Sequence, residues 1–178
     1  MCKMLKHDDI RLTEHFLLSE LTESCTARRY GIDNTPSAEQ VRNLRNLCEK
    51  VLEPLRMHFG VAVRVSSGYR SPELNRRVGG ASNSQHQTGQ AADIRVSDSR
   101  TGREWMEWII TECEFDQCIW ETADGVTFWI HISCCRNSSE NRGKVVKFLK
   151  KVKFEGENEI SCEKLQPFCD STGLYSSQ

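Results

Sequence analysis

The chain of 178 residues lacks a long apolar run, since no stretch approaches the roughly 20 residues that a membrane-spanning helix needs. It also lacks an excess of either charge. Its formal net charge of −1 argues against a general nucleic-acid binder or a protein that binds anionic membranes. The N-terminal stretch MCKMLKHDDIRLTEHF has no apolar core of the kind that a secretory signal carries. We therefore expect synthesis in the cytoplasm without a signal peptide, no nucleic-acid partner and no membrane-spanning segment.

Cysteine is abundant, but the arrangement that marks a structural zinc site is missing. The nine cysteines include no Cys-x-x-Cys pair and their number is odd, so a site of four cysteines is poorly supported. Without a signal peptide free thiols are the default, and we expect that no disulfide is needed for folding. Cys48 falls near the apolar face of an expected helix, where it acts as a small hydrophobic residue. Cys162 and Cys169 could pair in an oxidising medium.

Length and composition favour one globular domain. The chain is long enough for a sizeable core, and its 38% hydrophobic and 28% charged residues are ordinary for a soluble domain. We expect a single domain over residues 1–154, acting as a monomer. Residues 155–178 form a polar extension with few apolar anchors, which we expect to be weakly ordered.

Hydrophobic periodicity predicts two amphipathic helices. The first begins at Ser37, which forms a capping box with Gln40, and it ends at Gly60. Its apolar residues recur every three or four positions, and Pro54 is expected to kink it. The second helix covers Ser99–Cys113 and carries its apolar residues on one face.

Alternating and β-branched runs predict four strands, at Val61–Ser67, Gln90–Val96, Phe115–Thr122 and Val126–Ser133. Residues 123–125, which contain Asp-Gly, form a hairpin turn between the last two. The basic amphipathic run Arg142–Phe154 suits either a helix or a strand. Because helices and strands alternate irregularly, the expected fold class is α+β, with a small, mostly antiparallel sheet and helices packed against one face.

The strongest functional signal lies between Ser66 and Ile94. His86 stands in a loop rich in glycine, serine and asparagine, and Asp93 follows on the next expected strand. His131 stands in the strand-like run 126–133. Two histidines and one aspartate can form a three-ligand zinc site with the fourth position left for water. On residue types alone, an ordinary loop histidine and a half-buried strand histidine remain open as alternatives.

The segments SGYRSPELNRRVGG and SQHQTGQAADI resemble the zinc metallopeptidases of the D-Ala-D-Ala carboxypeptidase family, whose zinc-binding domain is shared with the Hedgehog signalling domain. Every fixed position of the family pattern Ser-x-His-x-x-Gly-x-Ala-x-Asp is present, and a later Trp-x-His occurs at 129–131. The resemblance covers roughly residues 16–142. It implies a Hedgehog/DD-peptidase-like fold and one zinc ion held by His86, Asp93 and His131.

The resemblance leaves the general base open. Many family members place an acid three positions before the last zinc histidine, but here that position is Phe128. We expect Glu121 to take this catalytic role, with Asp116 and Asp124 as other candidates. The alternative is that Glu121 is an exposed carboxylate beside the turn.

Three further residues are candidates for substrate binding. Arg70 corresponds to an arginine that the family uses near the scissile carbonyl, where it would hold the substrate and stabilise the oxyanion, unless it forms an ordinary surface ion pair. Ser84 either binds substrate or shapes the loop before His86. Trp129 either forms a wall of the substrate site or packs against the protein.

The function that the resemblance implies is a zinc-dependent peptidase that cleaves peptide bonds of peptidoglycan, in the stem peptide or the cross-link, by attack of a zinc-activated water. A phage or prophage endolysin would fit the missing signal peptide, because the protein acts on the cell wall only if it is released or exported. Two alternatives are a zinc-stabilised cell-wall or peptide-binding module without activity, and a D,D-dipeptidase or carboxypeptidase acting on small peptides.

Overall fold

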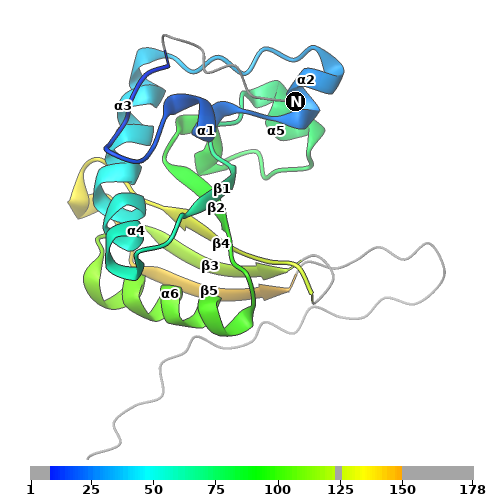
Figure 1. Ribbon diagram of the computed structural model, residues 1–178. Coiled ribbons are helices and arrows are strands. Elements are labelled where there is room, and N and C mark those ends of the chain that lie inside the picture. The colour runs from blue at the N-terminus through cyan, green and yellow to red at the C-terminus, as the bar shows by residue number, and fades with distance from the viewer. Residues whose placement is uncertain (1–8, 123–125, 150–178) are drawn as a thin grey trace, which may run out of the picture.

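The computed structural model describes residues 9–122 and 126–149 (Figure 1). The expected turn at 123–125 and the expected extension at 155–178 lie outside the described residues. The α-helices are α1 (Leu18–Thr22), α2 (Cys25–Tyr30), α3 (Ala38–Leu47), α4 (Glu53–Phe59), α5 (Pro72–Arg77) and α6 (Ser99–Glu112). The short π and 3-10 segments are η1 (Cys48–Leu52), η2 (Gln85–Thr88) and η3 (Ser138–Glu140). The strands are β1 (Arg64–Ser67), β2 (Ala91–Arg95), β3 (Gln117–Thr122), β4 (Phe128–Ser133) and β5 (Lys144–Leu149).

The five strands form one sheet in the order β1-β2-β4-β3-β5. The first three neighbouring pairs are antiparallel, whereas β5 runs parallel to β3. The α+β fold class with a mostly antiparallel sheet is therefore confirmed. All four predicted strands are present with shorter ends, and residues 144–149 of the ambiguous basic run form the fifth strand at the edge of the sheet.

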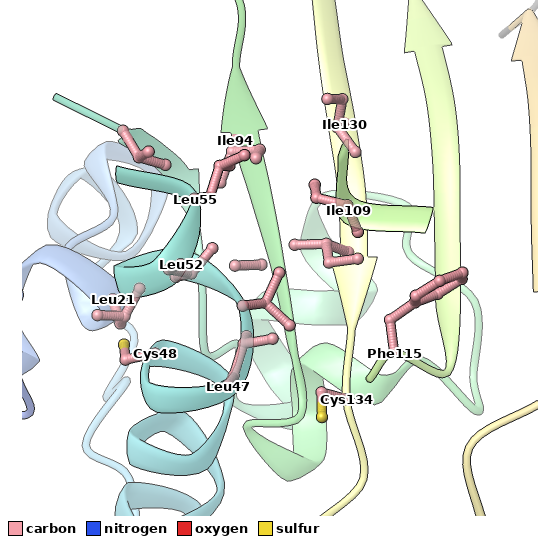
Figure 2. Close-up of a cluster of buried hydrophobic side chains, with 14 of the residues drawn as sticks. Leu21, Leu47, Cys48, Leu52, Leu55, Ile94, Ile109, Phe115, Ile130 and Cys134 are labelled. Carbon is pink, nitrogen blue, oxygen red and sulfur yellow. The ribbon is translucent and has the colours of Figure 1, made fainter. Parts of the chain in front are cut away.

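One face of the sheet carries the hydrophobic core, and the helices α3, α4 and α6 supply the other side of that core (Figure 2). Strand and helix residues of this core include Ala92, Ile94, Cys118, Trp120, Ile130, Ile132, Leu47, Leu52, Leu55, Trp105 and Ile109. Because side chains alternate along a strand, the odd-numbered residues Asp93 and His131 fall on the opposite face. Burial of one face thus leaves the other free for a functional site.

The predicted helix over residues 37–60 is divided into α3, η1 and α4, and the π turn η1 lies just before Pro54. Proline has no N–H, and its ring presses on the carbonyl four residues earlier, so a regular helix is strained there. The η1 turn directly precedes this region, and the Glu53 N–H donates to the Cys48 carbonyl, five residues back. This wider turn accommodates the proline without ending the helix.

Gly102 in α6 allows that helix to approach the sheet closely. A Cβ at this position would lie 2.0 Å from Cζ3 of Trp120, which is far inside van der Waals contact. We expect Gly102→Ala to lower the free energy of unfolding by about 1–3 kcal/mol, as overpacked cores do. At a helix position with free space the same change would raise it. Urea denaturation measures the sign, and Arg103→Ala, exposed on the same helix, is the control.

The six cysteines that fall within the described residues are all free. Cys48, Cys118, Cys134 and Cys135 are buried. Burial raises the pKa of the Cys118 thiol to about 12, so this thiol stays protonated and packs as an apolar group. That no disulfide is needed for folding stays a prediction.

No helix within residues 9–122 and 126–149 is long and apolar enough to cross a membrane.

Candidate metal centre

Three side chains converge on the open face of the sheet. The pairing of β2 with β4 places Asp93 directly opposite His131, and His86 reaches both from η2. Oδ1 of Asp93 lies 3.2 Å from Nε2 of His86 and 3.0 Å from Nδ1 of His131. The two histidine nitrogens are 3.2 Å apart. The structure therefore brings together all three residues that the sequence predicts as metal ligands.

The chemistry of these three atoms suits a cation. Nδ1 of His86 donates to the Gly68 carbonyl at 2.7 Å, which leaves Nε2, on the side of Asp93, as the ring nitrogen available to a metal. A cation shared by Nε2 of His86 and Oδ1 of Asp93 would be held by both atoms. Zinc bonds of about 2.0–2.1 Å in a tetrahedron place neighbouring ligand atoms about 3.3 Å apart, close to the three separations observed. The residues present therefore fit a zinc ion.

Arg70 completes the surroundings of Asp93. Its Nη2 donates to Oδ2 of Asp93, and its Nε donates to Oγ of Ser67 at 2.7 Å. Oδ1 of Asp93 is thereby left for the histidines. Burial alone would raise the pKa of Asp93, but His86 and His131 beside it outweigh burial and hold the pKa well below its ordinary value. The aspartate is thus kept ionised, as a metal ligand must be.

Two polar side chains of α3 hold the loop that carries His86, and neither was identified from the sequence. Nε2 of Gln40 donates to the Gln87 carbonyl at 3.0 Å, and Nδ2 of Asn43 donates to the Thr88 carbonyl at 2.7 Å. Gly89 follows with a φ of +74°, and a Cβ there would lie 2.6 Å from the Gln40 carbonyl oxygen. The glycine of the motif is therefore required both by its backbone conformation and by the close approach of α3.

Asn34 fixes the segment that carries Arg70, and it too was missed. Its Nδ2 donates to the carbonyls of Thr22 and Tyr69, and its Oδ1 accepts from the Ser71 N–H. Because this asparagine precedes the predicted helix in a polar stretch, it looks like an ordinary loop residue. Only the folded chain shows that it ties the end of α1 to the segment 69–71 beside the site.

Glu121 lies on the same sheet face as His131, one row away. It stands directly opposite Trp129 across β3 and β4, and the Trp129 indole N–H donates to its Oε2. His131 is two residues from Trp129 along β4, and its own partner on β3 is Ile119. The structure thus places Glu121 one row along the sheet from His131 and gives its carboxylate a hydrogen bond from Trp129; its role as the base stays a prediction.

The position where many family members carry an acid belongs to the core face here. Phe128 packs against Trp120, with ring centroids 5.2 Å apart. A carboxylate at position 128 would lose this ring contact. A phenylalanine in place of the acid is therefore consistent with the packing of β4.

The other acidic candidates have different positions. Asp116 is 1% exposed, and Arg142, hydrogen-bonded to it, holds the pKa of this carboxyl well below its usual range. Gln85 also donates to Asp116, so this acid braces η2 against the start of β3. Asp124 lies outside the described residues. Ser84 precedes η2, and its hydroxyl makes no hydrogen bond within the described part of the chain.

The comparison with protein families agrees with this geometry. A family model described as Peptidase M15 matches residues 14–133, which include the three candidate ligands, the arginine at 70 and the glutamate at 121. No curated protein matches the chain.

Proposed function

Because the chain belongs to the peptidase M15 family, we propose that it is a zinc-dependent peptidase that cleaves peptide bonds of peptidoglycan, in the stem peptide or in the cross-link. The observation that supports this most is the convergence of ligand atoms from His86, Asp93 and His131, all within 4.8 Å of one another. Release or export would bring the protein to the cell wall.

The residues around the cluster have different roles in the proposed hydrolysis. A zinc ion held there would lower the pKa of a water molecule and polarise the scissile carbonyl. Glu121 accepts the proton of the attacking water and returns it to the leaving amine, with its carboxylate oriented by the Trp129 indole. Arg70 keeps Asp93 in place, and its remaining N–H groups hold the substrate carbonyl oxygen as negative charge develops on it.

A peptide-binding module without activity is the second candidate, and the phenylalanine at position 128 favours it. This protein would retain zinc for stability and bind peptide without cleaving it. A dipeptidase or carboxypeptidase acting on small peptides is a narrower form of the first proposal, and it differs only in the products.

Digestion of purified sacculi tests the proposal. The zinc-loaded protein is expected to release peptide fragments, a chelator to stop the release, and added zinc to restore it, since the metal supplies the activated water. Mass spectrometry of the products identifies the bond cleaved. Turnover of free D-Ala-D-Ala but not of sacculi would point to the small-peptide activity, and bound peptide with no cleaved product would favour the binding module.

A further inference from the structure

Two arginines stand side by side on the functional face of the sheet. Arg64 on β1 is directly opposite Arg95 on β2. Both are exposed, and neither makes an ion pair or side-chain hydrogen bond with any residue in the ranges 9–122 and 126–149. Like charges directly opposite each other in an antiparallel pair are destabilising. The pair is therefore expected to lower stability unless an anion lies between the two guanidinium groups.

A bulge in β1 places this pair beside the metal centre. Arg64 faces Arg95 and Ser67 faces Asp93, with a register shift between Val65 and Ser67. In a regular strand positions 64 and 67 would lie on opposite faces, but the extra residue brings both to the face of Asp93. Bulges of this kind occur next to active sites, where they re-aim a side chain.

The distance from the metal centre matches a short piece of peptide. Arg95 and its β4 partner Trp129 form the row next to the row of Asp93 and His131. Neighbouring rows on one face are about 7 Å apart, which is about two residues of an extended chain. A hollow of about 280 Å³ extends between these two rows, and its lining includes Asp93, Arg95 and Trp129.

An exposed charge on an edge strand is often only a device against aggregation, and Arg64 lies on the edge strand β1. That explanation does not cover Arg95, because β2 lies inside the sheet between β1 and β4. Arg70, in contrast, is already engaged with Asp93 and Ser67. The pair of Arg64 and Arg95 is thus a separate feature from the arginine at the metal centre.

We propose that Arg64 and Arg95 form a carboxylate-binding subsite, which takes an anionic group of the substrate one to two residues from the scissile bond. The proposal rests on the peptidase function argued above. A carboxylate between two guanidinium groups accepts charge-assisted, bidentate hydrogen bonds and cancels the repulsion between the arginines. Trp129 forms an apolar wall beside it. The carboxylate is either the C-terminal group of the peptide or a side-chain group of an acidic residue.

Four matched peptides that contain one acidic residue distinguish these sources. One keeps both carboxylates, two have a single carboxamide at the C-terminus or at the side chain, and one has both carboxamides. Dissociation constants are measured by calorimetry on the zinc-loaded Glu121→Gln protein, in which cleavage is slow, and kcat/KM on the parent. Loss of the recognised carboxylate is expected to weaken binding about tenfold or more.

Variants of the two arginines test whether Arg64 and Arg95 cause the preference for the carboxylate. The double variant Arg64→Gln/Arg95→Gln is expected to lose the preference for the carboxylate while its affinity for the double carboxamide is unchanged. Its melting temperature should equal or exceed that of the parent, because the like-charge repulsion is gone. Arg103→Gln, exposed on α6 behind the other face, should keep the preference.

Two results would overturn the subsite: equal or unmeasurable affinity for all four peptides, or a preference that survives in the double variant. If the parent cleaves none of the peptides, the peptidase proposal fails. The dissociation constants then still decide the subsite independently.

Discussion

Glu121→Gln is expected to reduce kcat on peptidoglycan peptides roughly 10²–10⁴-fold, which is the usual value of a general base. The amide has the shape of the carboxylate, and its oxygen can still accept the hydrogen bond from the Trp129 indole. It cannot take a proton from water. Zinc content and melting temperature should therefore match the parent, measured by metal analysis and thermal denaturation alongside turnover.

Glu104→Gln, exposed on α6, is the matched control and should leave kcat unchanged. If Glu121→Gln turns over as fast as the parent, the base must be another acid. Asp116 is poorly suited, since Arg142 and Gln85 already occupy its oxygens. A parent protein that binds zinc and peptide but cleaves nothing would make the binding module the better description.

The local part of the site could be predicted from the sequence because its elements are short and regular. His86 and Asp93 are close along the chain. Side chains alternate along a strand, so Asp93 occupies the face opposite to that of Ala92 and Ile94. The antiparallel pairing of β3 with β4 was also expected, with Glu121 beside residues 126–128, whereas the observed register sets it opposite Trp129. What the sequence could not supply is the pairing of β2 with β4, which sets Asp93 against His131 across 38 positions. That register depends on burial of a whole sheet face, which no local pattern specifies.

The residues missed are those whose partners are backbone groups far away in sequence. Gln40 was interpreted correctly as part of a capping box, yet its amide also holds the loop of His86. Asn43 is buried on α3 together with Leu44 and Leu47, and its amide holds the same loop. The parallel pairing of β5 with β3 was also unpredicted, because a short basic run carries no direction.

His86→Ala and His131→Ala are each expected to abolish stoichiometric zinc binding, whereas the parent binds about one zinc per chain. Metal binds the native state far better than the unfolded chain. At zinc 100-fold above its dissociation constant, the parent should gain about 2.7 kcal/mol, which corresponds to a rise in melting temperature of about 5–10 °C. The variants should show no zinc-dependent rise.

The comparison with and without zinc separates the loss of the metal from other damage. His86 is 2% exposed, so its removal also leaves a cavity and an unpaired Gly68 carbonyl, which lower stability in the absence of metal. His131 is more exposed, so His131→Ala is the cleaner variant. His15→Ala is the control, because His15 lies in the other described group of possible ligands, with Glu14 and Glu53. In that group Glu53 is already bound by Thr13 and His15, so this variant should keep its zinc. Full zinc occupancy in both site variants, or loss of zinc in His15→Ala, would show that the metal does not bind at His86, Asp93 and His131.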